Sequence, residues 1–236
     1  MAAEGLELSE ATRAATFVVI AAFNEAGAIA EVVSELLPSY PNVVVVDDGS
    51  ADGTAREARE AGAAVLRHVV NRGQGAALQT GLTYGLQQGA RFLLTFDADG
   101  QHDPADIPAM IEPLERGEAE ICLGSRFLEH ADSVPLPRRI MLRGAVLFTR
   151  VTSGMKLSDA HNGFRAFTRK AAEHIDIRLD RMAHASEIID QVRQSRLPYR
   201  EVAVHIRYTD YSLAKGQRST AALKVAFDYL IGRVLR

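Results

Sequence analysis

Two aspartates separated by one small residue, Asp97-Ala98-Asp99, are the residues of this sequence best suited to chemistry. They follow an apolar run, 91–96 (RFLLTF), and precede Gly100-Gln101-His102. Two carboxylates at the end of a buried strand can both reach Mg²⁺ or Mn²⁺, which prefer oxygen ligands and keep water or substrate phosphates in their shell. Such an ion would act as a Lewis acid on a departing diphosphate. Because carboxylate pairs are also common on turns, the interpretation depends on the surrounding sequence.

The first hundred residues alternate between apolar runs and helical patterns. The predicted strands are 16–22, 42–46, 64–67 and 91–96, and the predicted helices are 25–37, 50–61 and 75–88. This alternation predicts an α/β fold with a mostly parallel sheet covered by helices on both faces. Ligands of such sheets bind beyond the carboxyl ends of the strands. Asn24-Glu25, Asp47-Asp48 and Asp97-Asp99 all fall at predicted strand ends, so we expect them to share one edge.

The second half predicts helices at 104–116, 138–152 and 183–195, strands at 119–123 and 199–206, and a turn at Asn162-Gly163 before a short strand. The chain ends in an apolar stripe at helical spacing, which predicts an amphipathic helix over 219–236. No linker separates two domains. We therefore expect a flexible N-terminal tail at 1–15, one domain at 16–218 and the C-terminal helix.

Composition limits the class of protein. The chain has 236 residues, is 47% apolar and 24% charged, and carries a net charge of -3. These values describe a globular protein with a sizeable core and argue against nucleic-acid binding, which favours a strongly basic face. Cys122 is the only cysteine, which excludes an intramolecular disulfide, fits a reducing cytoplasm and predicts a core residue. The N-terminus has no signal-peptide pattern, and no run of about 18 apolar residues predicts a membrane span.

Further motifs accompany the aspartates in a fixed order. They are Ala21-Ala22-Phe23-Asn24-Glu25, Val46-Asp47-Asp48-Gly49-Ser50, Asn71-Arg72-Gly73-Gln74-Gly75-Ala76-Ala77, Gly124-Ser125-Arg126 and 159–167 (DAHNGFRAF). Together they resemble the motifs of family 2 glycosyltransferases of the GT-A fold, with the closest likeness to the dolichol- and polyprenyl-phosphate mannosyl- and glucosyltransferases. The resemblance covers about residues 16 to 218 and implies a GT-A fold for that range.

The resemblance implies roles for individual residues. It places the donor nucleotide against Ala21, Phe23, Glu25, Asp47, Asp48, Gly73, Gln74, Asp97 and Ala98, and the metal on Asp97 and Asp99. A carboxylate accepts from ribose or base donors and an aromatic ring offers a stacking face, although Asp47-Asp48-Gly49-Ser50 also reads as a turn and helix cap. Many relatives carry lysine at the position of Gln74, and a neutral amide cannot supply the same charge to a phosphate.

The catalytic candidates implied by the resemblance are Asp99 and Asp159. Asp159 would act as a general base toward a hydroxyl acceptor, or would orient groups if the acceptor is a phosphate, which is already an anion. The alternative is a capping aspartate in a loop. The candidates for contact with the diphosphate or an acceptor phosphate are Gln101, Arg126, Arg139, Arg143, Arg207 and Lys215, because arginine suits phosphate through its fork of donors. The alternative for Arg207 and Lys215 is an ordinary solvent-exposed loop. The alternative for Arg139 and Arg143 is a helix that packs on the core and exposes a basic face to solvent.

Two histidines receive other interpretations. His184 and Glu187 share a helical spacing, but two such ligands do not make a metal site, so we predict a structural role. His102 lies beside the aspartates and could be a metal ligand, although the resemblance favours a supporting polar role.

The resemblance therefore predicts an inverting transfer of a hexose from a GDP- or UDP-sugar, with Mg²⁺ or Mn²⁺, to polyprenyl phosphate at the cytoplasmic face of the membrane. Alternatives are transfer to a saccharide hydroxyl during polysaccharide synthesis and a non-catalytic nucleotide-sugar binding subunit. A nucleotidyltransferase is disfavoured, because Phe23-Asn24-Glu25 occupies the place of its glycine- and basic-rich loop. The helices at 138–152 and 219–236 predict peripheral membrane attachment, a membrane partner protein or a homodimer.

Overall fold

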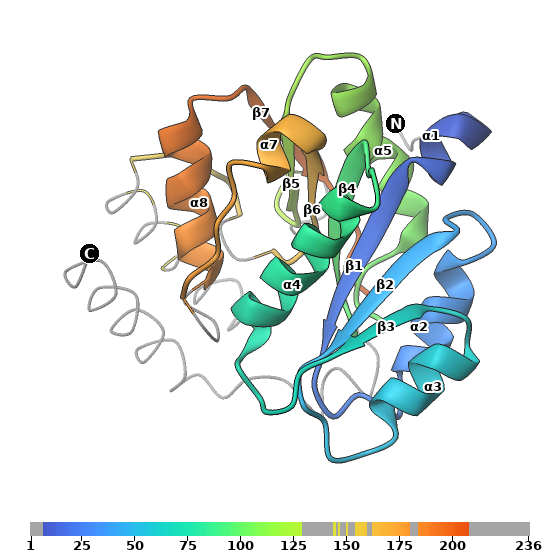
Figure 1. The fold of residues 1–236 in the computed structure, drawn as a ribbon. Helices are drawn as coiled ribbons and strands as arrows, with labels where there is room; N and C mark the ends of the chain where they lie inside the picture. Colours follow the sequence, from blue (N-terminus) through green and yellow to red (C-terminus); the bar gives the residue numbers. More distant parts are fainter. Residues whose placement is uncertain are drawn as a thin grey trace.

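A computed structural model describes residues 7–128, 144, 146, 150, 154–159, 162–179 and 184–207. Figure 1 shows a central sheet with helices on both sides. The strands are β1 (Thr16–Ala22), β2 (Asn42–Asp47), β3 (Ala64–Arg67), β4 (Phe92–Asp97), β5 (Ile121–Ser125), β6 (Arg165–Thr168) and β7 (Tyr199–Ala203). The helices are α1 (Glu10–Ala14), α2 (Ile29–Leu36), α3 (Thr54–Glu60), α4 (Gln74–Gln87), η1 (Pro104–Asp106), α5 (Ile107–Glu115), α7 (Arg169–Ala172) and α8 (His184–Ser195).

The strands form one seven-stranded sheet in the order β3-β2-β1-β4-β6-β5-β7. All of them run in one direction except β6, which is antiparallel to both β4 and β5. The prediction of a mostly parallel α/β sheet is therefore confirmed. The reversed strand was not predicted. It matters for function because it begins at the edge where its neighbours end.

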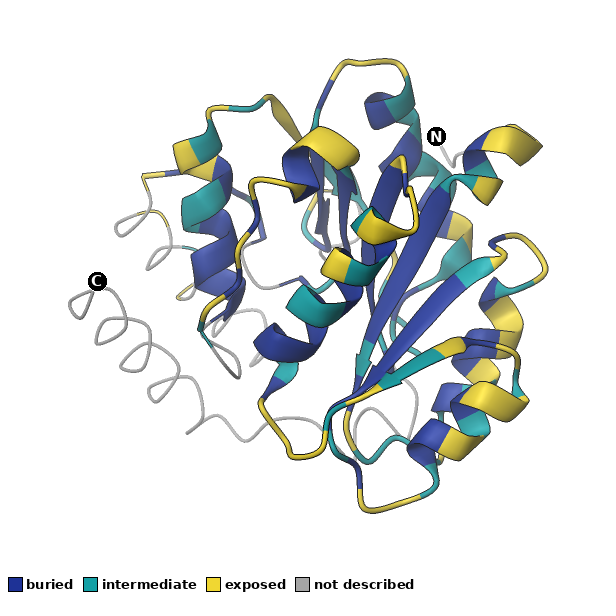
Figure 2. Cartoon of the chain, in the orientation of Figure 1, coloured by how far each residue is buried: buried dark blue, intermediate teal, exposed yellow. Residues whose placement is uncertain are grey.

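The apolar runs form strands because they are buried on both faces. Val43 and Val45 of β2 lie in one core cluster, and Val44 and Val46 lie in the other. A strand inside a parallel sheet alternates sides but meets apolar neighbours on each, so its sequence is continuously hydrophobic. Figure 2 shows these central strands as buried along most of their length. Burial of each valine contributes about 1.5 to 3 kcal/mol.

Helices α2, α3 and α5 supply residues to the first core cluster, whereas α4, α7 and α8 supply residues to the second. The sheet is thus covered on both faces, as predicted, and Cys122 is fully buried in β5. Among the helices that the structure describes, none combines the length and the apolar character needed to cross a bilayer.

The prediction of a flexible tail over 1–15 is wrong for residues 9 to 15. These residues form α1 and its caps, because the Ser9 side chain accepts a hydrogen bond from the Thr12 amide at 3.1 Å. Thr12 is buried, its hydroxyl bonds Glu115, and its carbonyl accepts from the Thr16 hydroxyl at 2.8 Å. A side-chain cap and anchoring contacts hold this short helix on the domain.

Candidate active site

The acidic clusters do share one edge of the sheet. Asp47 is the last residue of β2 and Asp97 is the last residue of β4, and both strands run parallel to β1, which ends just before Phe23. β4 and β1 are hydrogen-bonded neighbours, with Ala21 beside Asp97 in the register. The sequence prediction that these motifs converge beyond the carboxyl ends of the strands is confirmed.

Asp97 and Asp99 are only partly buried, and Ala98 between them is buried. The Gln74 side-chain amide donates to Asp97 Oδ1 at 3.4 Å, and His102 Nε2 lies 3.0 Å from Asp97 Oδ2. Asp99 Oδ1 accepts from the Gln101 amide at 3.1 Å. The contacts of Asp97 thus come from α4 and from the loop after β4, while the hydrogen bond to Asp99 comes from the turn that follows it.

The surroundings shift the pKa values of the two carboxyl groups in opposite directions. Burial alone raises the pKa of Asp97, but the charge and hydrogen bond of His102, together with the charges of Arg165 and His184, lower it below its usual value. Burial and then the neighbouring charge of Asp97 raise the pKa of Asp99. Two carboxylates that repel each other at a sheet edge are a donor set that a divalent cation would neutralise.

Asp97 and Asp99 suit a cation that completes its coordination shell with water and with oxygen atoms of a bound substrate. In the described part of the chain, no three His, Cys, Asp or Glu side chains gather into a complete metal site. Asp97 and Asp99 would supply two oxygen ligands, and Mg²⁺ or Mn²⁺ characteristically completes its shell with water and substrate phosphate. The His102 ring lies against Phe96 and Phe164, with centroids 5.2 and 4.9 Å away. This packing places His102 beside Asp97, and whether it also ligates a metal stays open.

The turn that precedes β6 leaves little space beside the Asp97 carboxylate. The Gly163 carbonyl accepts from the Thr95 hydroxyl at 2.6 Å. A Cβ atom at position 163 would lie 2.5 Å from Asp97 Oδ1, so only glycine leaves room for the carboxylate. The turn at Asn162-Gly163 was predicted from the sequence, but its contact with Asp97 was not.

Asp159 forms a buried ion pair with Arg126. Arg126 Nε and Nη2 donate to the two carboxylate oxygens of Asp159 at 2.6 and 2.9 Å, and both residues are less than a tenth exposed. Glu201 supports the loop by accepting from the amides of Ser158 and Asp159 at 2.8 and 3.2 Å. In this structure the fork of donors of Arg126 binds Asp159, and contact of Arg126 with a phosphate stays a prediction. The same pairing favours an orienting role for Asp159 over that of a general base.

The loops after β1 and β2 are tied together. The Asn24 amide donates to the Ser50 hydroxyl at 2.9 Å, and the Glu25 amide donates to the Thr54 hydroxyl at 2.8 Å. Asn24 adopts a left-handed conformation with φ 56°, which turns the chain away from β1. Phe23 is 44% exposed, so its ring is open to a stacking partner. Binding of a base by Phe23 and Glu25 stays a prediction.

The side chains of Asp47 and Asp48 are used inside the protein. Asp48 accepts from the amides of Arg72 and Gly73 at 2.9 and 2.6 Å and from His68 Nδ1 at 2.7 Å. Asp47 accepts from the Ser50 amide at 3.1 Å. Both carboxylates are buried, which supports the alternative of a turn that organises the loops. Direct contact of either one with a ribose stays a prediction.

The glycine-rich entry to α4 is also positioned by these contacts. Gly73 has φ 96°, a conformation that favours glycine, and its amide is the one bound by Asp48. Gln74 then begins α4 and reaches Asp97. Gln74 therefore serves the carboxylate in this structure, and its contact with a phosphate stays a prediction.

Arg207 is bound to acidic residues outside the aspartate pair. Its Nη1 donates to Glu35 at 2.9 Å and its Nη2 donates to Asp103 at 2.8 Å, while its amide donates to the Gln101 carbonyl at 2.8 Å. The predicted diphosphate contact of Arg207 would require these ion pairs to break. Arg139, Arg143, Lys215 and the helices predicted at 138–152 and 219–236 lie wholly or largely outside the described residues.

Two functional candidates were missed in the sequence, Asn162 and Arg165. Arg165 opens β6 and is fully buried, and the charges of Asp97 and Asp159 both act on it. The available signal was a cation inside an otherwise apolar strand, between Phe164 and Ala166. Glu187, by contrast, accepts from the Leu179 amide at 2.7 Å, in keeping with its predicted structural role.

Buried polar atoms without a hydrogen-bond partner gather at this edge. In the described residues they are Asp47 Oδ2, His102 Nδ1 and Nε2, Asn162 Nδ2 and Arg165 Nη1. Two of these atoms lie at ion-pair distance from a charged partner, because His102 Nε2 is 3.0 Å from Asp97 Oδ2 and Asp47 Oδ2 is 3.0 Å from Arg67 Nε. Because buried polar groups are nearly always satisfied, their concentration at one edge indicates a place built for a ligand.

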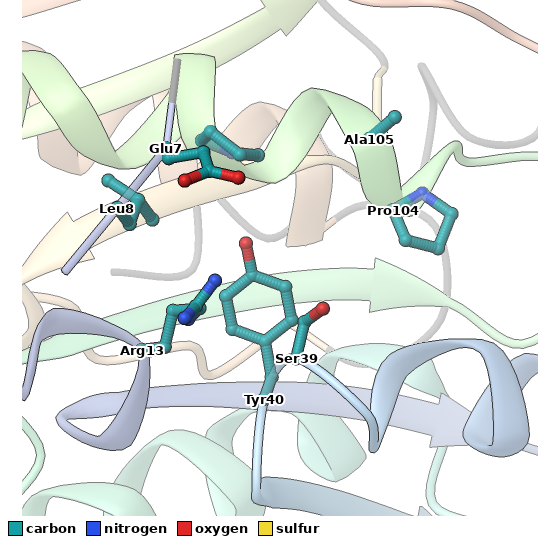
Figure 3. Close-up of a pocket in the computed structure, with 8 residues that line it drawn as sticks. Glu7, Leu8, Arg13, Ser39, Tyr40, Pro104 and Ala105 are labelled. Carbon is teal, nitrogen blue, oxygen red and sulfur yellow. The ribbon is translucent and has the colours of Figure 1, made fainter. Parts of the chain in front are cut away.

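A separate pocket of about 200 Å³ lies between the α1 region, the loop after α2, and η1 with the start of α5 (Figure 3). Its lining includes Arg13 and Tyr40, and it shares no residue with the edge described above. Burial raises the pKa of Tyr40 to about 12, so its phenol is neutral at physiological pH. The pocket lacks the acidic pair that marks the sheet edge.

Comparison with protein families gives a match for residues 17–176, to the family described as glycosyl transferase family 2. An uncharacterized protein of Methanocaldococcus jannaschii is 34% identical over 99% of this chain and 98% of its own length. The UDP-N-acetylglucosamine--dolichyl-phosphate N-acetylglucosaminyltransferase of Methanococcus voltae is 30% identical over 93% of this chain and 97% of its own length. The polyprenol monophosphomannose synthase of Mycolicibacterium smegmatis is 29% identical over 89% and 83%.

Solved structures share the fold. Glucosyl-3-phosphoglycerate synthase from Mycobacterium tuberculosis, in complex with Mg²⁺ and uridine diphosphate, superposes with a TM-score of 0.66 at 18% identity. The match covers 94% of this chain and 84% of the synthase. The predicted GT-A fold is confirmed.

Proposed function

Because the chain belongs to glycosyl transferase family 2, we propose that it transfers a hexose from a GDP- or UDP-sugar to polyprenyl phosphate, with inversion at the anomeric carbon. The Arg126–Asp159 pair is the observation that carries the choice of acceptor. A hydroxyl acceptor needs a general base, whereas a phosphate acceptor is already an anion. An aspartate whose two oxygens accept from a guanidinium is suited to orienting groups, which is what a phosphate acceptor requires.

Two named relatives support this acceptor. The Methanococcus voltae protein is named for transfer to dolichyl phosphate, and the Mycolicibacterium smegmatis protein for synthesis of a polyprenol phosphomannose. Each alignment covers more than four fifths of both proteins. A donor linked to a nucleoside diphosphate is supported by the synthase structures that contain uridine diphosphate with Mg²⁺ or Mn²⁺.

Asp97 and Asp99 would hold Mg²⁺ or Mn²⁺, and the bound ion would supply Lewis-acid stabilisation of the leaving diphosphate. Other residues of the site orient the two aspartates and offer a surface to the nucleotide. Gln74 and His102 orient Asp97, the Gln101 amide orients Asp99, and Phe23 offers a stacking face at the neighbouring strand end. Direct displacement then inverts the anomeric carbon without a covalent intermediate.

The test is transfer of labelled sugar to a short polyprenyl phosphate in the presence of Mn²⁺, with GDP- and UDP-sugars compared. We expect label in the organic phase, and Asp97→Ala should abolish it while leaving the circular dichroism and melting temperature near those of the wild type. Label confined to water-soluble glycan would favour a saccharide acceptor. Neither transfer nor donor hydrolysis with any sugar would favour a nucleotide-sugar binding subunit.

The cytoplasmic membrane face stays our predicted location, with attachment through the helices expected at 138–152 and 219–236. Flotation with anionic liposomes is the direct measurement. A protein that stays in the aqueous phase as a stable dimer would replace peripheral attachment by self-association of the same apolar stripe.

A further inference from the structure

Arg165 is a buried cation for which the described residues provide no hydrogen-bonded or ion-pair partner to the side chain. Its side chain is among the largest that are fully buried, and its Nη1 has neither solvent nor a hydrogen bond. Within the residues that the structure describes, its guanidinium makes no ion pair. Burial lowers the pKa of Arg165 to about 10, against the opposing charges of Asp97 and Asp159, so the group is still protonated at neutral pH.

A second unpartnered donor lies three residues away. Asn162 is 5% exposed, and its Oδ1 accepts from the Phe164 amide at 3.0 Å, which fixes the orientation of the side chain. Its Nδ2 is left buried without an acceptor. One short segment therefore places two unsatisfied donors at the same sheet edge, on either side of the glycine that touches Asp97.

The position of Arg165 is between the two halves of the candidate site. In the register it lies beside Thr95 of β4 and Leu123 of β5. β4 leads into Asp97, and β5 leads into Arg126, which holds Asp159. A group bound by Arg165 would sit where the sugar donor and the acceptor must meet.

An arginine that served only the fold would be expected to bind a carboxylate or carbonyl directly, because an uncompensated buried charge is strongly destabilising. Arg126, which was predicted to contact a phosphate, is already bound to Asp159. An anion with several acceptor oxygens would satisfy both orphaned donors, and arginine binds phosphate well through its planar fork.

We propose that Arg165 and Asn162 form a buried anion subsite that binds a phosphate group between Asp97 and Asp159. The inference rests on the proposed function for its two phosphate sources, which are the lipid-phosphate acceptor and the diphosphate of the donor. Arg165 is the principal phosphate ligand of this subsite, and Asn162 adds one hydrogen bond.

The test is calorimetric titration without metal or sugar donor, so that binding is measured apart from activity. The probes are citronellyl phosphate, its neutral alcohol citronellol, and GDP and UDP. We expect the wild type to bind the phosphate and not the alcohol, and Arg165→Met to weaken phosphate binding about tenfold or more. Arg165→Lys should recover part of the affinity. The control is the exposed Arg169→Gln, which removes an ion pair with Glu173 and hydrogen bonds to the Leu86 and Ala90 carbonyls and should leave phosphate binding unchanged.

Thermal unfolding separates a binding role from a structural one. Replacement of an unpaired buried charge by an apolar side chain of similar length is often neutral or stabilising, so Arg165→Met should keep or raise the melting temperature while losing phosphate. If Arg165→Met fails to fold, or melts well below the wild type, a structural role is indicated. Asn162→Ala then decides, and phosphate binding equal to the wild type in that variant overturns the subsite.

The outcomes also separate this inference from the proposed function. Loss confined to citronellyl phosphate assigns the subsite to the acceptor, and loss confined to GDP or UDP assigns it to the donor. Phosphate binding that depends on Arg165 in a protein without polyprenyl transfer would leave the subsite standing and remove the proposed acceptor. Transfer in the wild type together with unchanged phosphate binding by Arg165→Met would support the proposed function and overturn the subsite.

Discussion

Gly163→Ala should damage the proposed metal site at Asp97 and Asp99 while sparing the fold. A Cβ atom at position 163 would lie 2.5 and 2.6 Å from the two carboxylate oxygens of Asp97. Carbon and oxygen atoms in proteins approach to about 3.3 Å at closest, so the carboxylate must retreat by roughly 0.7 Å or more. Metal–ligand distances tolerate a change of only about 0.2 Å. The ligand would therefore leave its coordinating position.

The magnitude follows from that displacement. Disturbing the groups that orient a metal ligand lowers affinity by about 10- to 100-fold, which corresponds to about 1.4 to 2.7 kcal/mol. The stability change should be small, within about 1 kcal/mol, because Gly163 does not have a positive φ and the clashing atoms end a side chain that can move.

The assay is a titration of Mn²⁺ in the presence of GDP or UDP, with free Mn²⁺ measured by electron paramagnetic resonance. Gly117→Ala is the matched control, because Gly117 has φ +71° and open space around it after α5. That substitution should lower stability by about 1 kcal/mol through backbone strain and leave Mn²⁺ binding intact. If Gly163→Ala binds Mn²⁺ as the wild type does, the turn does not position Asp97 and the reasoning fails.

Three further predictions concern stability and reactivity. Arg126→Met should destabilise the protein by about 3 to 5 kcal/mol in urea unfolding, because it removes the guanidinium that pairs with the buried Asp159 carboxylate; a loss under 1 kcal/mol would contradict a strong contribution of this pair. Cys122 is buried and its pKa is raised to about 12, so a disulfide reagent at pH 8 should label it only after unfolding, and rapid labelling of the native protein would count against this. The hydrogen bond from Thr168 is the largest cause that lowers the pKa of Glu120, so the stability lost in Glu120→Gln should be full above pH 4.5 and vanish as the pH falls through the lowered pKa. Equal pH dependence of unfolding in the two proteins would argue against that hydrogen bond.

The parallel part of the sheet could be predicted from the sequence because each strand is marked by a short local pattern. Continuous valine runs such as 43–46 identify strands buried on both faces, and each is followed at once by acidic or glycine-rich turns. Strands that share a direction bring their carboxyl ends to one edge, so Asp47 and Asp97 could be placed together without coordinates. The short helix α1 was missed because a five-residue segment carries little periodicity, and its order depends on contacts with distant Glu115.

The partners of the charged residues could not be read from the sequence. Arg126 and Asp159 are 33 positions apart, and Arg207 and Glu35 are 172 positions apart. Each arginine looked available for phosphate because local patterns carry no information on which carboxylate folds against it. Arg165 is the opposite case. Its apolar neighbours suggested a strand, but only the structure reveals a buried guanidinium whose Nη1 has no hydrogen-bond partner among the described residues.

The reversed direction of β6 explains how the two halves of the site come together. A parallel strand delivers only its last residues to the carboxyl edge, whereas an antiparallel strand delivers its first residues there. β6 begins at Arg165, so the preceding turn, with Asn162 and Gly163, enters the edge beside Asp97. In the same way the segment before that turn carries Asp159 to Arg126 at the end of β5. A parallel strand in this position would have left Arg165 at the opposite edge of the sheet. The strand that departs from the parallel pattern among those described is thus the element that joins Asp97 and Asp99 to the Arg126–Asp159 ion pair, and the unsatisfied donors of Asn162 and Arg165 are what a bound phosphate would complete.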